Sequence, residues 1–151
     1  MADDDRPVLV QEYLHIQKTV EDFDQKALTI KAWSVTFSCA GLGLAHSQGQ
    51  PMVLLISAFS ALVFWIVEAL WKNNQQAYYL RLTEIETHFA PQGAPTKPLR
   101  IKKAWSESWH RSGKHRMAMK IMAWPHIALP HIIVVAAGIA LFLLHAPIPK
   151  N

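Results

Sequence analysis

Two long runs of apolar residues dominate the sequence. The first covers residues 52–72, in which the charged residues are Glu68 and the terminal Lys72. The second covers residues 124–146 and contains no Lys, Arg, Asp or Glu. Because a helix needs about 20 apolar residues to cross the hydrocarbon core of a bilayer, both runs predict transmembrane helices.

A third, shorter apolar run precedes these two. Residues 32–45 carry no charged side chain, and extending the run back to residue 27 gives it spanning length. This extension places Lys31 near the membrane interface, which a long basic side chain can reach with its ammonium group. We therefore expect a transmembrane helix over 27–47 and an all-α membrane protein with three spans. The alternative is a buried helix of a soluble core, but we see no soluble segment large enough to cover it.

Apolar residues continue at heptad spacing beyond the first two spans. Steps of three and four residues between apolar positions are typical of a continuous helix that packs against another helix. The row before the first span is Leu9, Tyr13, Ile16, Val20, Phe23, Ala27 and Ile30. The row after the second span is Trp71, Gln75, Tyr78, Leu82, Ile85 and Phe89. Each row therefore predicts that its transmembrane helix continues outside the membrane.

A fold-back at Gly49 brings the two rows face to face, with Leu9 opposite Phe89. Residues 1–89 are therefore predicted to form a long antiparallel hairpin whose two ends make a helical stalk in the cytoplasm. The alternative is a first helix that lies flat on the membrane surface. The acidic residues of that helix argue against this arrangement, because the inner leaflet of a membrane is anionic.

The same register places small side chains where the predicted spans meet. It sets Gly41 opposite Ser57 and Phe37 opposite Ala61. Small residues allow helix backbones to approach closely in lipid, where apolar surface alone gives no drive for association. The expected helix-packing positions are Ser34, Ser38, Gly41, Ser57, Ala61 and, in the third span, Gly138.

The basic residues are distributed unevenly and predict the orientation of the chain. The net charge is +4, and most Lys and Arg lie between the second and third spans, whereas the connection 46–51 has no fixed charge. Cytoplasmic segments of membrane proteins carry an excess of Lys and Arg. We therefore expect a bacterial inner-membrane protein with its N-terminus in the cytoplasm and its C-terminus in the periplasm. The acidic start of the chain does not resemble a signal peptide.

A breaker segment and a basic segment connect the second and third spans. Residues 90–98 contain three Pro and one Gly and predict a linker that ends the stalk. Residues 99–123 mix basic side chains with Trp, Ile and Met, which is typical of an amphipathic segment on anionic lipid headgroups. Gly113 is expected to divide this segment into two short helices. The expected headgroup ligands are Arg100, Lys102, Lys103, Arg111, Lys114, Arg116 and Lys120.

A nucleic-acid site is the alternative interpretation of this basic, aromatic segment. Basic residues next to a transmembrane helix are, however, ordinary signals of membrane topology. We therefore expect the bilayer, and not a nucleic acid, to be the partner of residues 99–123.

Glu68 is the residue that most clearly suggests chemistry, because an ionisable group inside a span is costly and indicates a functional site by default. In the hairpin register it faces the first span near Lys31, and Lys72 follows one turn later on its own helix. Buried charges are usually paired. We therefore expect an ion pair of Glu68 with Lys31 or Lys72 near the inner interface. The alternative is an ion or proton site at Glu68.

His126 and His131 flank the start of the third span. Five residues of helix separate their imidazoles by about 140°, so they do not form a two-ligand metal site. A proton-sensing role for His131 requires Glu68 nearby at a similar depth, which the expected topology permits. The simpler interpretation is that the face of the third span that carries His131 packs on the hairpin.

No catalytic or cofactor motif is recognisable. The serines Ser34, Ser38 and Ser57 are expected to lack a neighbouring His and carboxylate and to serve in packing. The single cysteine, Cys39, is expected to lie in lipid, and it excludes a disulfide scaffold. There is no glycine-rich phosphate loop and no zinc spacing. We therefore predict a protein that is not an enzyme and that uses no metal and no cofactor.

Three stretches resemble those of small three-span inner-membrane proteins of bacteria, a family to which no function is attached. They are residues 31–36 (KAWSVT), 64–72 (FWIVEALWK) and 124–131 (WPHIALPH). The resemblance spans most of the chain and implies a location in the bacterial inner membrane. The hairpin with a cytoplasmic stalk is also similar in shape, but not in motif, to small two-helix membrane effectors of bacterial defence systems.

The small number of helices and the small residues in the spans indicate how the protein acts. Three helices bury little surface on their own, and faces of small residues favour lateral packing. We expect the protein to act through homo-oligomerisation, with an ion-conducting pore lined by Ser and His faces as one form of that assembly. The alternative is a non-catalytic accessory or scaffold subunit that docks on another membrane protein.

Overall fold

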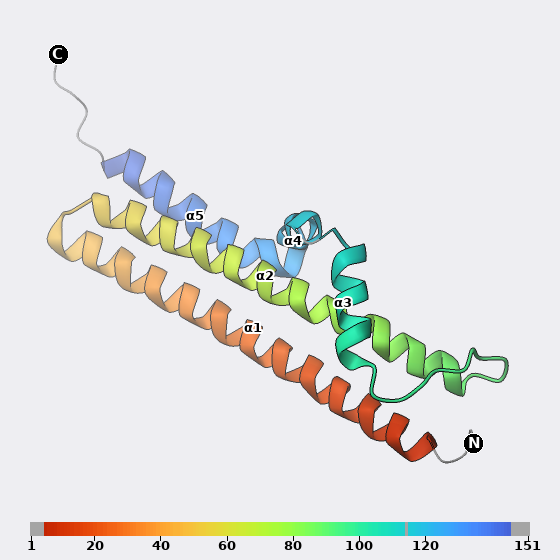
Figure 1. The fold of residues 1–151 in the computed structure, drawn as a ribbon. Coiled ribbons are helices and arrows are strands. Elements are labelled where there is room, and N and C mark those ends of the chain that lie inside the picture. Colours follow the sequence, from red (N-terminus) through yellow and green to blue (C-terminus); the bar gives the residue numbers. More distant parts are fainter. Residues whose placement is uncertain (1–4, 114, 146–151) are drawn as a thin grey trace. The chain divides into compact units, whose positions relative to one another are not determined.

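The computed structural model describes residues 5–113 and 115–145, and the regular elements in that part of the chain are all α-helices. Figure 1 traces them in chain order. They are α1 (Arg6–Gln48), α2 (Met52–Phe89), α3 (Ile101–Arg111), α4 (His115–Met122) and α5 (Pro125–His145). The prediction of an all-α chain is therefore confirmed.

Three of these helices, α1, α2 and α5, are long and apolar enough to cross a membrane. Many of their large apolar side chains point outward, as Trp33, Phe59 and Ile133 do. Exposed apolar side chains at this density suit contact with lipid tails rather than water. The prediction of three apolar helices of spanning length is confirmed.

The described residues form two compact units. The polar unit contains residues 5–26, 70–113 and 115–119, and the apolar unit contains residues 27–69 and 120–145. Each of the two longest helices, α1 and α2, contributes one part to each unit.

In the apolar unit, α1 and α2 are joined by a tight turn at Gly49. Gly49 has a φ of +62°, a conformation that glycine adopts without steric cost. The backbone N–H of Gln50 donates to the carbonyl of Ala45 at 3.3 Å, which caps the last turn of α1. Pro51 follows and suits the start of α2, because the first turn of a helix needs no backbone donor.

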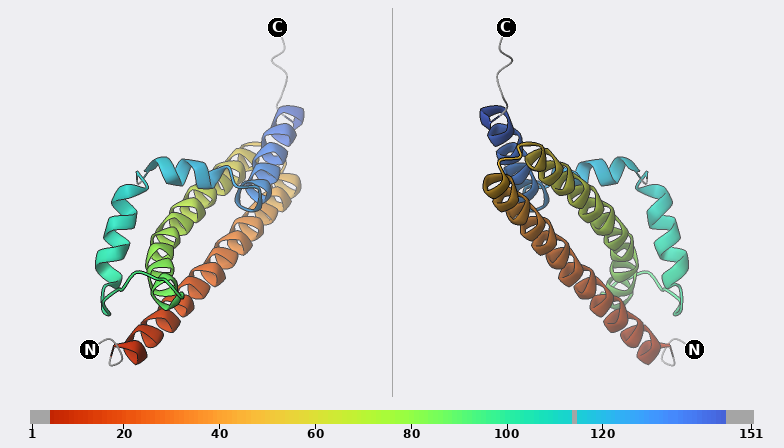
Figure 2. Two further views of the ribbon diagram at one scale, coloured as in Figure 1. Left: turned by 90° about the vertical axis from the view of Figure 1, so that its right-hand side faces the viewer. Right: turned by 90° about the vertical axis from the view of Figure 1, so that its left-hand side faces the viewer.

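Small residues set the closest approaches between the helices of the apolar unit. A Cβ atom added to Gly41 would lie 1.7 Å from Oγ of Ser57, so α1 and α2 touch there. A Cβ atom added to Gly138 would lie 3.1 Å from both Cβ of Ala58 and the carbonyl oxygen of Leu54. Both views in Figure 2 show α5 beside the start of α2. Close backbone approach at small residues is the packing mode expected in lipid.

The polar unit has a hydrophobic core made from both heptad rows. Its buried members and the half-buried side chains packed on them are Leu9, Ile16, Val20, Leu82, Ile85, Tyr13, Tyr78 and Ile101. The aromatic ring of Trp71 lies 4.7 Å from that of Phe23, and Nε1 of Trp71 donates to the carbonyl of Phe23 at 3.1 Å. Ile101 brings α3 onto this core. Apolar residues of α1, α2 and α3 therefore stabilise the polar unit together.

The segment between α2 and α5 has the two predicted interruptions of helix, one in the linker after α2 and one at Gly113. Residues 90–100 contain no helix, and α3 and α4 are separated at Gly113, whose φ is +73°. Most of the expected headgroup ligands are exposed, and Arg100 is half-buried. Lys114 lies outside the residues that the structure describes.

Candidate functional site

A chain of polar side chains joins all three helices of the apolar unit. Oγ of Ser34 in α1 lies 3.1 Å from Nδ1 of His131 in α5. Nε2 of the same imidazole lies 3.0 Å from Oε2 of Glu68 in α2. Oε1 of Glu68 in turn lies 3.0 Å from Nζ of Lys31 in α1. These four residues, Ser34, His131, Glu68 and Lys31, form the buried network.

The buried network is almost completely shielded. Ser34, Glu68 and His131 are each 1% exposed, and the side chain of Lys31 is 22% exposed. Removing a polar or charged group from water costs free energy unless hydrogen bonds and opposite charge replace the water. Both carboxylate oxygens of Glu68 and both ring nitrogens of His131 have partners, so this replacement is complete for the two groups.

The imidazole of His131 is oriented by two further features. The indole of Trp65 stacks on it, with ring centroids 6.3 Å apart and planes inclined by 11°. Nε1 of Trp65 donates to the carbonyl of Met122 at 3.0 Å, which holds the indole in place. Pro130 precedes His131 inside α5. Proline has no backbone N–H and disturbs the hydrogen bonding of the preceding turn.

The structure brings together some of the predicted charged residues and separates others. Of the two predicted partners of Glu68, Lys31 forms the ion pair. Lys72 pairs instead with Asp24 in the polar unit. His126 is exposed and its ring packs on Trp124, so it is not part of the buried network. The expected ion pair of Glu68 is therefore present, and Lys31 is its partner among the two alternatives.

The expectation that Ser34 has no His and carboxylate nearby is wrong. Its hydroxyl contacts His131, which contacts Glu68. No local pattern indicates this arrangement, because the three residues lie on three helices and 63 or 97 positions separate the contacting pairs. A Ser, His and Glu in a row resembles a nucleophilic triad in composition. With Ser34 only 1% exposed, however, its hydroxyl is closed to a substrate in this structure.

The predicted packing residues lie inside the apolar unit. Ser38 donates from Oγ to the carbonyl of Ser34 at 2.7 Å, and Ser57 donates to the carbonyl of Val53 at 3.0 Å. Ala61 is fully buried. Ser34, Ser38, Ser57 and His131 are therefore buried within the apolar unit. Ser38 and Ser57 donate to carbonyls of their own helices, whereas Ser34 and His131 contact each other across two helices.

A second polar cluster lies in the polar unit and was not predicted. Arg81 in α2 is fully buried and meets Glu12 in α1 through two hydrogen bonds, Nε to Oε1 at 2.8 Å and Nη2 to Oε2 at 3.0 Å. Its guanidinium also donates to Glu84, to Oγ1 of Thr96 and to the carbonyl of Lys97. Arg81 therefore ties the linker after α2 to both long helices.

Glu12 completes this cluster from the other side. Its carboxylate accepts the backbone N–H of Leu99 at 2.8 Å and that of Arg100 at 3.3 Å. Burial by itself raises the pKa of Glu12, but the hydrogen bond and charge of Arg81 and the N–H of Leu99 outweigh it and lower the pKa below its ordinary value. Leu99 has a φ of +60°, in the left-handed region that a residue with a side chain rarely adopts. Its strained backbone is held by this carboxylate.

One signal for this cluster was present in the sequence. Glu12 and Arg81 each directly precede an apolar residue of their heptad row, Tyr13 and Leu82. Charged residues that flank the apolar seam of two packed helices often pair across it. The participation of the linker could not be predicted, since residues 96–100 have no periodic pattern.

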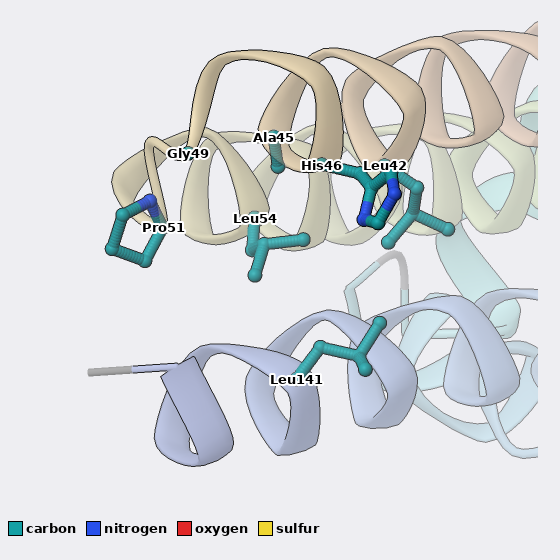
Figure 3. Close-up of a pocket in the computed structure, with 7 residues that line it drawn as sticks. All are labelled: Leu42, Ala45, His46, Gly49, Pro51, Leu54 and Leu141. Atoms are coloured by element: carbon teal, nitrogen blue, oxygen red, sulfur yellow. The ribbon is translucent and has the colours of Figure 1, made fainter.

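The apolar unit also contains a groove beside the turn between α1 and α2, shown in Figure 3. Its volume is about 300 Å³. The lining residues are Leu42, Ala45, His46, Gly49, Pro51, Leu54 and Leu141. Six of these seven side chains are apolar or absent, so the groove offers little for chemistry. In the described part of the chain, no group of three His, Cys, Asp or Glu residues is placed to hold a metal ion.

Comparison with known proteins does not assign the chain to a family. No family model, no curated protein and no solved structure matches the chain.

Proposed function

We propose that this chain is a multi-pass protein of the bacterial inner membrane that acts through self-association of its apolar unit. In this proposal residues 1–89 form a hairpin whose ends stand in the cytoplasm as a stalk. The N-terminus is cytoplasmic and the C-terminus is periplasmic. The uneven distribution of Lys and Arg along the chain supports this orientation.

The observation that carries the proposal is a stripe of small residues on the outer surface of α1. The stripe consists of Ala32, Thr36, Cys39, Ala40 and Gly43, all of which are exposed. At 100° per residue these positions lie within about 100° of one another on the helix. Small residues three and four positions apart allow a second helix to approach closely in lipid. A stripe of this kind suits contact with α1 of another copy.

The inward orientation of the polar groups supports the same proposal. Ser34, Glu68 and His131 find their partners within one apolar unit, so the unit needs no second protein to satisfy them. Over residues 32–44 of α1, the exposed side chains are the small-residue stripe and large apolar residues such as Trp33 and Phe37, rather than a polar face. If the assembly encloses a pore, its wall includes residues other than these three.

The exposed basic residues of residues 99–123 support a contact with anionic lipid headgroups. Lys102, Lys103 and Arg111 are exposed on α3, and Arg116 and Lys120 are exposed on α4. Each basic residue near an anionic surface contributes about 1 kcal/mol to attraction. We therefore propose the anionic leaflet as their partner and expect no nucleic acid.

The single cysteine offers a direct experiment, because Cys39 is exposed and lies within the stripe. Oxidation of the full chain in membranes with a copper catalyst should form a disulfide-linked dimer. A matched variant carries Cys39→Ala together with Val63→Cys, which moves the thiol to an exposed position on α2. This variant should stay monomeric on a denaturing gel. Equal cross-linking of both proteins, or none of Cys39, would contradict the proposal.

Two further measurements separate the forms that self-association can take. A closed homo-oligomer that conducts ions in planar bilayers would be a channel, whereas a closed oligomer without conductance would be a non-conducting assembly. A monomer that purifies with one constant membrane protein would identify an accessory subunit and overturn self-association.

A further inference from the structure

Leu99 is the most exposed of the large apolar side chains in the described part of the chain, with an exposed fraction of 81%. Its φ of +60° costs free energy for a residue with a Cβ atom. The carboxylate of Glu12 holds this backbone, because it accepts the N–H groups of Leu99 and Arg100. A buried acid thus fixes a strained turn that presents a leucine at the surface, and an apolar side chain presented in this way suits contact with a partner.

The polar unit also has an apolar groove between α1 and α2, with a volume of about 350 Å³, which is called the flank groove. Ile85 is almost fully buried there, whereas Val10 and Phe89 are 44% and 39% exposed. The charged residue in the lining is Glu86, whose carboxylate accepts the hydroxyl of Tyr13 at 2.8 Å. The lining residues are Val10, Tyr13, Ile85, Glu86, Phe89 and Ala90.

Leu99 and the flank groove lie on opposite flanks of the seam between α1 and α2. Leu99 is bound to Glu12, which pairs with Arg81, whereas Val10 and Glu86 line the groove. Around α1, Val10 and Glu12 are about 160° apart, and around α2, Arg81 and Glu86 are about 140° apart. Val10 lies within one helical turn of Glu12, so the groove and the leucine are at the same level of the polar unit.

This placement suits contact between copies of the chain. Copies of a membrane protein share one orientation and one depth, so two different surfaces can meet between neighbours only where they lie at the same level. A contact between two different surfaces of a protein repeats from copy to copy and produces a ring when the rotation closes. The following inference rests on the proposed self-association and on an upright stalk.

We propose that Leu99 of one copy enters the flank groove of the next copy, so that the polar units form a closed ring. Each copy gives its leucine to one neighbour and its groove to the other. Lys97 is exposed on the same side as Leu99, since the half-buried Pro98 separates them and alternate residues of an extended segment point the same way. Lys97 is therefore placed to meet Glu86, the acidic residue of the neighbour's groove.

The test is oxidation of the full chain in membranes with a copper catalyst, in a variant with Cys39→Ala, Val10→Cys and Leu99→Cys. Opposite flanks separate positions 10 and 99 within one chain, so a disulfide between them has to join two copies. A denaturing gel should show dimers, trimers and larger products, because every chain is linked to two neighbours. A largest product of two chains, or monomer alone, overturns the proposal.

The controls separate this contact from random collision. Val10→Cys alone and Leu99→Cys alone, each in the Cys39→Ala background, should remain monomeric. The matched pair is Lys18→Cys with Leu99→Cys, because Lys18 is exposed on α1 and does not line the groove. This pair should give no products larger than a monomer. Equal products from both pairs would overturn the proposal.

A charge exchange tests the polar part of the contact. In the background with Val10→Cys and Leu99→Cys, Glu86→Lys should reduce the larger products, because it sets like charges opposite each other. Adding Lys97→Glu should restore them. If Glu86→Lys has no effect, or if the exchange restores nothing, Lys97 and Glu86 do not meet between copies.

Leu99→Gly tests the apolar part of the contact without a loss of fold. Glycine adopts a φ of +60° without the cost that leucine has, so the amide protection of residues 99 and 100 should persist. Loss of a buried leucine side chain should weaken each contact about tenfold or more. Energy transfer between labelled copies, followed as lipid is added, measures this shift. Persistent protection with unchanged energy transfer would overturn the proposal.

Oxidation of Cys39 in the wild type, in parallel membranes, reports on self-association itself. If Cys39 forms a disulfide-linked dimer but positions 10 and 99 do not cross-link, the ring contact is wrong and the proposed function stands. If neither cross-links, the proposed function fails together with the ring contact.

Discussion

His131 lies with Nε2 3.0 Å from Oε2 of Glu68, and this contact joins α5 to α2 in the interior of the apolar unit. Through the two outer ends of the pair, Ser34 and Lys31, the contact extends to α1. Three helices that expose mostly apolar surface are thus connected by a few polar atoms.

Loss of the carboxylate should strongly destabilise the apolar unit. Glu68→Ala leaves the imidazole of His131 and the ammonium of Lys31 without their shared acceptor. Breaking one partner of a buried ion pair costs about 3–5 kcal/mol in the free energy of unfolding. Denaturant titration in detergent micelles, followed by circular dichroism, measures this value. The control is Val67→Ala, an exposed neighbour on the same helix, and an equal loss in both variants would contradict the role of Glu68.

Packing at Gly138 should tolerate no side chain. A Cβ atom at this position lies 3.1 Å from the backbone carbonyl oxygen of Leu54, which cannot move aside as a flexible side chain would. Gly138→Val should lower the free energy of unfolding by about 1–3 kcal/mol, the usual cost of overpacking. Ala140→Val, exposed in the same helix, should have little effect. Similar stabilities of the two variants would show that α5 does not pack through Gly138.

The polar unit should lose stability in acid because of Glu12. The pKa of Glu12 is lowered in the folded chain, so this carboxylate contributes stability that is complete above its ordinary value of about 4.3. That contribution is lost as the pH falls from there through the lowered pKa of the folded state. Amide hydrogen exchange of Leu99 and Arg100, whose N–H groups donate to Glu12, measures the effect at several pH values.

The matched variant for this prediction is Glu12→Gln, which cannot ionise. Exchange in its linker should be faster than in the wild type at pH 7 and should depend on pH only through the intrinsic exchange chemistry. If the wild type and Glu12→Gln show the same corrected protection down to pH 3, the buried pair with Arg81 does not hold the linker.

The proposed orientation predicts which cysteines a membrane-impermeant maleimide can label. In a Cys39→Ala background, Lys103→Cys should be labelled only after the inner membrane is opened. Gln50→Cys, in the turn between α1 and α2, should be labelled in intact spheroplasts. The reverse pattern would place residues 99–123 in the periplasm and would contradict the proposed topology.

Much of the helix content could be predicted from the sequence, because it depends on local patterns. The predicted spans at 27–47 and 52–72 lie within α1 and α2, and α5 covers residues 125–145 of the predicted span at 124–146. The core of the polar unit draws on both heptad rows, which were visible at steps of three and four. The position of Gly49 indicated the turn, because only glycine adopts its φ without cost.

The polar contacts were harder to predict, because each depends on residues far apart in the chain. The pairing of Glu68 with Lys31 was one of two alternatives, and geometry selected it over Lys72. Ser34 gave no signal of its contact with His131, since a serine in a span is usually a packing residue. Arg81 lies beside the heptad row rather than in it, so its burial depends on the linker that folds over it.

The subunit count in lipid tests the central claim of self-association most directly. Native mass spectrometry of the full chain from nanodiscs should give a multiple of the 17.1 kDa monomer. Gly43→Leu, which places a bulky side chain on the small-residue stripe, should shift the population to the monomer. A wild type that is monomeric at every lipid-to-protein ratio would contradict the account, as would an oligomer that Gly43→Leu leaves unchanged.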